Sequence, residues 1–113
     1  VTFNRDKSLD KVKQIVSYIE SHYTEPITVQ STADYLGFSE SHFMRYFKET
    51  MGTSFVDYLR DYRLTIASRL LTTSDSSILD IAAESGFENL SYFNRVFKQK
   101  YSMTPRQFRK ESQ

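Results

Sequence analysis

The sequence predicts an all-α protein, with about seven helices that form two helix-turn-helix subdomains joined by a long linker helix. Three observations support this fold class. Apolar residues recur at helical spacing along most of the 113-residue chain. Only three glycines and two prolines are present, and no sustained alternation of apolar and polar residues indicates a strand. One pattern also occurs twice, which is typical of a repeated supersecondary unit.

The repeat consists of eight residues that recur with the same identity. The shift between the copies is 49 residues before the turn and 50 after it, so the second copy has one extra residue in its turn. Each copy places a glycine between two helical patterns, as in a helix-turn-helix unit. The first copy is Ala33, Gly37, Phe38, Ser41, Phe43, Arg45, Phe47 and Lys48, and the second is Ala82, Gly86, Phe87, Ser91, Phe93, Arg95, Phe97 and Lys98.

The first predicted helix runs from residue 9 to about residue 23. Ser8 is its expected N-cap, and an apolar stripe that includes Ile15 and Ile19 gives it a packing face. The following Glu25-Pro26 pair favours extended backbone and closes the helix.

The next two helices form the first helix-turn-helix unit. Thr28 begins a short helix that ends at Leu36, and Gly37 follows as a left-handed stop, which only a residue without Cβ adopts easily. Ser39 is the predicted cap of a second helix that ends near Met51. We expect this first subdomain to occupy residues 1–53.

Residues 54–74 are predicted to form the linker helix. Ser54 and Asp57 have the spacing of a capping box, and helical periodicity continues from there to Leu71. A helix of about 19 residues is about 28 Å long, close to the roughly 34 Å between successive major-groove faces on one side of B-DNA. The length therefore permits two recognition helices one turn of DNA apart.

The second subdomain is predicted at residues 75–113. A short helix begins after Ser77 and ends before Gly86, and Asn89 caps the helix that follows. Thr104, followed by Pro105 at the first helical position, predicts a terminal helix.

The second helix of each unit has an apolar and a polar face. Phe43 with Phe47, and Phe93 with Phe97, are spaced four residues apart and define the buried faces. Phe38 and Phe87 are expected to fill the core beside each turn. At 100° per residue the opposite faces carry Ser41, Met44, Arg45 and Lys48 in the first unit, and Ser91, Asn94, Arg95 and Lys98 in the second.

The matched outer faces indicate DNA binding. A surface exposed to water needs no particular residues to fold, so their recurrence favours a partner over duplication followed by drift on an idle surface. Arginine can pair with guanine and asparagine with adenine, short serines allow close approach, and a late lysine can reach phosphate. His42 is either a phosphate contact or a packing histidine. The net charge of +1 is weak support, but six basic residues and no acidic ones lie between residues 89 and 110. They are Arg95, Lys98, Lys100, Arg106, Arg109 and Lys110.

Other classes of protein fit the sequence less well. The chain has no cysteine, and its two histidines lack partners at metal-ligand spacing. No glycine-rich phosphate loop or nucleophile elbow is present, so we expect no enzyme activity and no cofactor. No apolar run is long enough to span a membrane, and we expect a cytoplasmic protein. The alternative is a helical protein-interaction module, because aromatic residues make up 15% of the chain.

The chain resembles the DNA-binding domain of the AraC/XylS family of bacterial transcription regulators. The resemblance covers about residues 9–110 and is carried by the stretch from Ile81 to Phe87, by residues 91–98 and by residues 103–109. It implies two helix-turn-helix subdomains that insert into adjacent major grooves of promoter DNA, with RNA polymerase as a further partner. The chain starts at Val1, and members of this family usually carry a sensory or receiver domain as well, so we expect a fragment of a longer regulator.

The resemblance and the outer faces together give the candidate DNA-contacting residues. The residues expected to contact bases are Ser41, Met44, Arg45, Leu90, Ser91, Asn94 and Arg95. The residues expected to contact the DNA backbone are Ser39, His42, Lys48, Asn89, Lys98 and Thr104.

The chain departs from the family pattern at three positions. Ser102 stands where glycine is usual, so the turn there is either left-handed and strained by roughly 1 kcal/mol or adopts another conformation. Met44 and Leu90 occupy positions where polar residues are frequent. Apolar side chains can contact thymine methyl groups but form no hydrogen bonds with bases, so selectivity is expected to depend on Arg45, Asn94 and Arg95.

Overall fold

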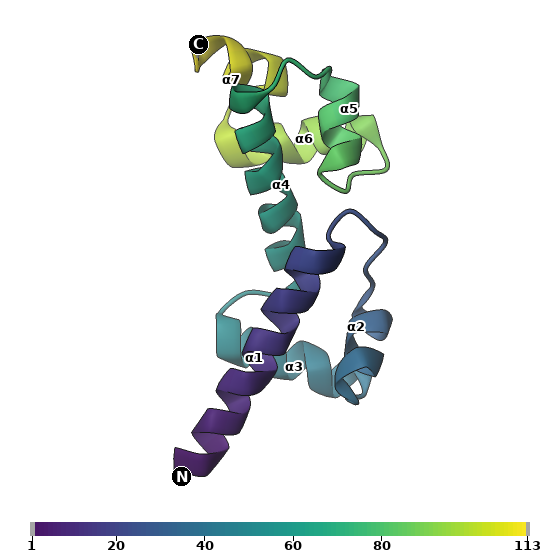
Figure 1. Cartoon of the computed structure of the whole chain (residues 1–113), viewed down its shortest axis with the longest axis vertical. Coiled ribbons are helices and arrows are strands. Elements are labelled where there is room, and N and C mark those ends of the chain that lie inside the picture. Colours follow the sequence, from purple (N-terminus) through teal and green to yellow (C-terminus); the bar gives the residue numbers. More distant parts are fainter. Residues whose placement is uncertain (1, 113) are drawn as a thin grey trace. The chain divides into compact units, whose positions relative to one another are not determined.

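The computed structural model describes the backbone of residues 2–112 and the side chains of residues 10–112. Within this range the chain forms seven helices and no strand, which confirms the predicted fold class (Figure 1). The helices are α1 (Thr2–His22), α2 (Val29–Leu36), α3 (Glu40–Met51), α4 (Phe55–Thr73), α5 (Ile78–Glu84), α6 (Leu90–Tyr101) and α7 (Pro105–Glu111).

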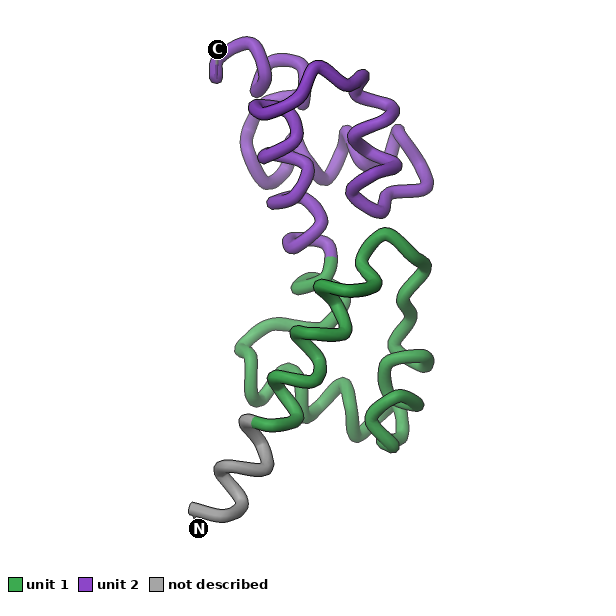
Figure 2. The backbone as a smooth tube through the Cα atoms, viewed as in Figure 1, with its two compact units in different colours: residues 1–59 green, residues 60–113 purple. Residues whose placement is uncertain are grey.

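The chain divides into two compact units, residues 1–59 and residues 60–113 (Figure 2). The division falls inside α4, so one helix contributes to both units. Phe55 and Leu59 belong to the core of the first unit, and Leu64, Ala67 and Leu71 belong to the core of the second. The two cores are therefore built on different segments of α4.

Most of the predicted helix starts are confirmed by hydrogen bonds. Thr28 accepts the amide N–H of Ser31 at 2.9 Å, and Ser54 accepts that of Asp57 at 3.1 Å. Ser77 accepts the amide N–H of Asp80 at 3.0 Å. Each bond satisfies one of the amide groups that a first helical turn leaves without a partner.

The predicted start of the first helix is wrong. α1 begins at Thr2, so Ser8 lies inside the helix instead of capping it. The physical reason is that residues 2–7 contain neither glycine nor proline, the two residues that most strongly oppose a helical backbone. The predicted stripe is present farther along, where Ile15 and Ile19 are each 1% exposed.

The core of the first unit is centred on three phenylalanines. The rings of Phe43 and Phe55 are 5.1 Å apart and those of Phe47 and Phe55 are 5.4 Å apart, both edge to face. This geometry is the one that aromatic quadrupoles favour. Ala33, four residues before Gly37, is fully buried, which allows α2 and α3 to approach closely.

Phe38 departs from the core position predicted for it. It is half-buried, and its ring lies 4.5 Å from His42, 5.6 Å from Tyr46 and 5.4 Å from the Lys11 amine. Its counterpart Phe87 is 7% exposed and lies in the core of the second unit, as predicted. The two turns therefore bury their phenylalanines to different extents.

The core of the second unit also contains a pair of phenylalanines from one helix, and α7 adds a third. Phe93 and Phe97 are fully buried, 5.7 Å apart, and Phe97 meets Phe108 of α7 edge to face at 5.4 Å. α7 is also joined to the end of α4 through Arg109. Its guanidinium donates to the carbonyl oxygens of Leu71 at 3.1 Å, Ser74 at 3.2 Å and Ser76 at 2.7 Å. Arg109 thus satisfies carbonyl groups at the helix end and in the loop leading to α5.

Ser102 has left-handed backbone, one of the two conformations left open by the sequence, with φ 62° and ψ 18°. It is the only non-glycine residue with positive φ among the described residues. A side chain in this region crowds the following carbonyl, which costs about 1–2 kcal/mol for an L-residue.

We predict that Ser102→Gly stabilises the second unit by about 0.5–1 kcal/mol, because the relief of backbone strain exceeds the extra entropy of an unfolded glycine. Denaturant unfolding measures the change. Ser112→Gly is the matched control, since Ser112 also ends a helix but has φ −87°. An equal gain in both variants would show that strain at Ser102 is not the cause.

We predict that Arg109→Ala lowers the free energy of unfolding by about 2–3 kcal/mol, because three carbonyl oxygens lose a charged donor. Arg106→Ala, three residues earlier on the same helix and exposed, should change it by less than about 0.5 kcal/mol. Chemical denaturation of both variants tests this, and similar values would mean that the Arg109 contacts add nothing to stability.

Candidate nucleic-acid interface

The outer face of α3 carries the residues that the helical spacing predicted. Ser41, Met44, Arg45 and Lys48 are all exposed, whereas Phe43 and Phe47 on the opposite face are at most 1% exposed. Burial of the two phenylalanines fixes the rotation of the helix about its axis. The four exposed side chains are therefore presented together on one face of the first unit.

The outer face of α6 has the same arrangement. Phe93, Val96 and Phe97 are at most 5% exposed and hold the helix against α4 and α5. All predicted contact residues of this helix are exposed: Leu90, Ser91, Asn94, Arg95 and Lys98. Lys48 occupies the position on α3 that is equivalent to Lys98 on α6. The basic residues of both outer faces are therefore exposed to solvent.

Three of the residues predicted to contact the DNA backbone are also helix caps. Ser39 accepts the amide N–H of His42 at 3.2 Å, and Asn89 accepts that of Tyr92 at 2.8 Å. Thr104 accepts the amide N–H of Gln107 at 3.1 Å and is half-buried. Each cap lies at the positive end of a helix dipole, where an anion is favoured.

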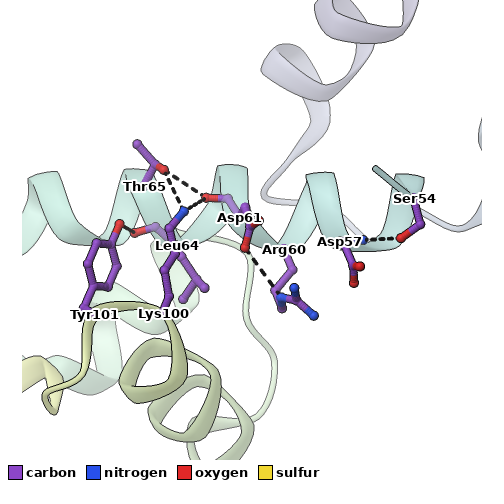
Figure 3. Close-up of polar contacts among 8 residues, drawn as sticks. All are labelled: Ser54, Asp57, Arg60, Asp61, Leu64, Thr65, Lys100 and Tyr101. Carbon is purple, nitrogen blue, oxygen red and sulfur yellow. Dashed lines mark hydrogen bonds and ion pairs between the residues drawn. The ribbon is translucent and has the colours of Figure 1, made fainter. Parts of the chain in front are cut away.

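Two of the six basic residues in the predicted basic segment are committed to contacts inside the second unit. Lys100 donates to the Asp61 carbonyl at 3.2 Å and the Thr65 hydroxyl at 3.4 Å (Figure 3). Arg109 binds the carbonyl groups described above. We therefore expect the electrostatic attraction for phosphate in this segment to depend mostly on the other four, Arg95, Lys98, Arg106 and Lys110, all of which are exposed.

A small recess lies between α4 and α6 in the second unit. It has a volume of about 210 Å³, and Arg60, whose Nε lies 3.7 Å from a carboxylate oxygen of Asp61, forms part of its lining. The recess is smaller than the sites that enclose drug-sized ligands. Its lining residues are Arg60, Asp61, Leu64, Val96, Gln99 and Lys100.

Sequence reasoning missed an aromatic partner of Arg95. The Arg95 guanidinium lies over the Tyr92 ring, 5.2 Å from its centroid, and Tyr92 is 38% exposed. The spacing of Tyr92 and Arg95 could have predicted this contact, because residues three apart on a helix are neighbours. Tyr92 also interacts electrostatically with Arg63 of α4. Burial lowers the pKa of Arg63, and Glu88 and Tyr92 partly oppose that shift.

The first unit has a histidine where the second has Tyr92. His42 is exposed and packs its ring edge to face against Phe38 at 4.5 Å, so it makes a packing contact while its side chain remains accessible. Neighbouring Tyr46 has its pKa raised by burial, and a hydrogen bond from Thr50 opposes the shift. Tyr46 thus contacts both Phe38 and Thr50.

The described residues contain no group of three or more His, Asp or Glu side chains arranged to hold a metal ion. None of the helices in the described part of the chain combines the length and apolar character needed to cross a bilayer.

Comparison with known proteins places this arrangement in a family. A family model described as a helix-turn-helix domain matches residues 32–111. An HTH-type transcriptional regulator of Staphylococcus aureus is 37% identical over 111 residues, which is 96% of this chain and 15% of the relative. The chain thus spans a small part of that regulator's length.

Solved structures agree with this match. The C-terminal domain of the two-component response regulator YesN from Fusobacterium nucleatum superposes with a TM-score of 0.86 at 34% identity, covering 88% of this chain and 98% of that domain. The DNA-binding domain of the global transcriptional factor AdpA, solved in complex with a target DNA, gives a TM-score of 0.84 at 26% identity, covering 88% of this chain and 89% of that one. The chain therefore belongs to the AraC/XylS-type helix-turn-helix family, the DNA-binding domains of transcription regulators.

Proposed function

We propose that this chain binds promoter DNA sequence-selectively by inserting α3 and α6 into successive major grooves. The observation that carries the proposal is the match between the two exposed faces. Ser41, Arg45 and Lys48 recur as Ser91, Arg95 and Lys98, and all six side chains are open to solvent. Folding places no such demand on an exposed face, whereas a duplex with repeating grooves does.

The base contacts are assigned by side-chain chemistry. Arg45 and Arg95 donate to guanine through paired N–H groups, and Asn94 pairs with adenine. Ser41 and Ser91 allow the helix backbone to approach the groove floor. Met44, 48% exposed, and Leu90, 37% exposed, contact thymine methyl groups.

The phosphate contacts come from cations and helix starts. Lys48 and Lys98 lie three residues beyond Arg45 and Arg95, toward the C-terminal end of each helix, and reach the DNA backbone. His42 donates to phosphate from the first turn of α3. Ser39, Asn89 and Thr104 present hydroxyl or amide groups at capped helix starts, where the helix dipole favours an anion.

Residues 54–74 serve as the spacer between subdomains at residues 1–53 and 75–113 in this proposal. α4 has 19 residues and a length of about 28 Å, which suits grooves about one turn of DNA apart. The chain acts in the cytoplasm of a bacterium as part of a longer regulator with a sensory or receiver domain. It works by binding DNA and contacting RNA polymerase, without catalysis.

The competing function is a helical protein-interaction module. Tyr35 favours this alternative, because it is 59% exposed and its ring packs at a tilt against that of Tyr18, with centroids 4.8 Å apart. The dependence of binding on salt concentration distinguishes the two functions. Duplex binding weakens steeply as salt rises, with a slope near 0.9 per phosphate contact, whereas an apolar peptide groove responds little.

We predict that Arg95→Ala weakens binding to the preferred site by about 1–3 kcal/mol and relaxes base selectivity there. Lys98→Ala should instead weaken binding to preferred and random duplexes alike and reduce the salt slope by about 1. Fluorescence anisotropy titrations over a range of salt concentrations measure both effects. Equal losses on preferred and random DNA for Arg95→Ala would remove it from the base-contacting role.

We predict that duplexes selected from a random pool share a motif with two half-sites about 10–10.5 base pairs apart, centre to centre. Variants of each recognition helix assign the halves: Arg45→Ala should lose selectivity at one half and Arg95→Ala at the other. A selected motif with a single half-site, or with no fixed spacing, would contradict insertion of both helices.

A further inference from the structure

The contact between Tyr92 and Arg95 distinguishes the two recognition helices. In α6 the Arg95 guanidinium lies over the Tyr92 ring at 5.2 Å, within the range of a cation–π interaction. In α3 the equivalent pair is His42 and Arg45. Among residues 10–112, whose side chains the structure describes, Arg45 has no such ring partner.

The Tyr92 ring is itself held by the second unit. It lies 6.2 Å from the buried Phe87 ring, and its amide N–H is fixed by the Asn89 cap at 2.8 Å. The ring therefore joins the core of the unit to an exposed arginine. It is 38% exposed, so one part packs and another faces the outer surface of α6.

We propose that Tyr92 is a positioning residue that orients Arg95 for base recognition, an inference that rests on the proposed function. An arginine side chain on a helix surface samples many rotamers, and it must give up that freedom to form a paired contact with guanine. A ring that already holds the guanidinium reduces this ordering cost. The benefit falls on the preferred site, because random sequences do not offer the matching acceptors.

The experiment compares Tyr92→Phe with Tyr92→Leu. The first keeps the ring and removes the hydroxyl, and the second removes the ring. The quantity measured is the ratio of the dissociation constants for random and preferred duplexes, with the preferred duplex taken from selection with the unmodified chain. Tyr92→Phe should keep the ratio within about twofold, and Tyr92→Leu should lower it on the order of fivefold.

A double-mutant cycle separates positioning from a direct contact. In an Arg95→Ala background, Tyr92→Leu should lower the ratio by less than about twofold, since the side chain it orients is gone. In a Lys98→Ala background it should lower the ratio as much as in the unmodified chain. Melting temperatures check the fold, and Tyr92→Gln replaces Tyr92→Leu if the latter does not melt cooperatively.

Each result decides one claim. If Tyr92→Phe loses as much selectivity as Tyr92→Leu, the hydroxyl acts on DNA and the positioning role is wrong. An equal loss in the Arg95→Ala background also overturns it. An unmodified chain that binds all duplexes equally overturns the proposed function itself, whereas a selective chain unaffected by Tyr92→Leu overturns only the role of Tyr92.

Discussion

Burial of paired phenylalanines on α3 and α6 is the constraint on which the rest of the structure depends. Phe43, Phe47, Phe93 and Phe97 are at most 1% exposed. Truncating any one of them would leave a cavity that costs about 3–5 kcal/mol, a large part of the stability of a domain this small. Because residues four apart share a face, burying each pair sets the rotation of the helix, and the residues on the far side are exposed as a group. Packing energy thus determines which side chains of these helices are exposed.

The caps and turns then set where each recognition helix begins. Ser39 and Asn89 each accept an amide N–H of the first turn, which favours one starting residue over its neighbours. Gly37 and Gly86 have φ 76° and 96°, which lets the chain reverse within a few residues. The buried phenylalanines set the rotation of each helix about its axis, and the cap sets the residue at which the helix begins. Together they place Arg45 and Arg95 on the exposed faces.

Much of this could be predicted because it depends on local rules. Helical periodicity, capping residues and glycine stops act over a few residues, and they located the seven helices and the outer faces. Contacts between distant segments could not be found in the same way. Arg109 and Lys100 counted as candidates for phosphate attraction, yet their partners lie more than 30 residues away in sequence, on α4 and the loop after it. The prediction for the start of α1 failed for a different reason. Residues 2–7 contain no glycine or proline to stop a helix, so a good cap residue at Ser8 does not have to begin one.

The turns of the two units differ in length by one residue, yet the helices that follow them bury equivalent phenylalanines. In the first unit the cap Ser39 follows Phe38 directly, whereas Glu88 stands between Phe87 and the cap Asn89. Phe87, in the longer turn, lies in the core, whereas Phe38 is half-buried against Lys11 and His42. Despite this difference both recognition helices bury the same two positions and expose the same serine, arginine and lysine. The orientation of the exposed face is therefore controlled by the inner face of the helix, and the two turns differ in length without a change in which of these side chains are exposed.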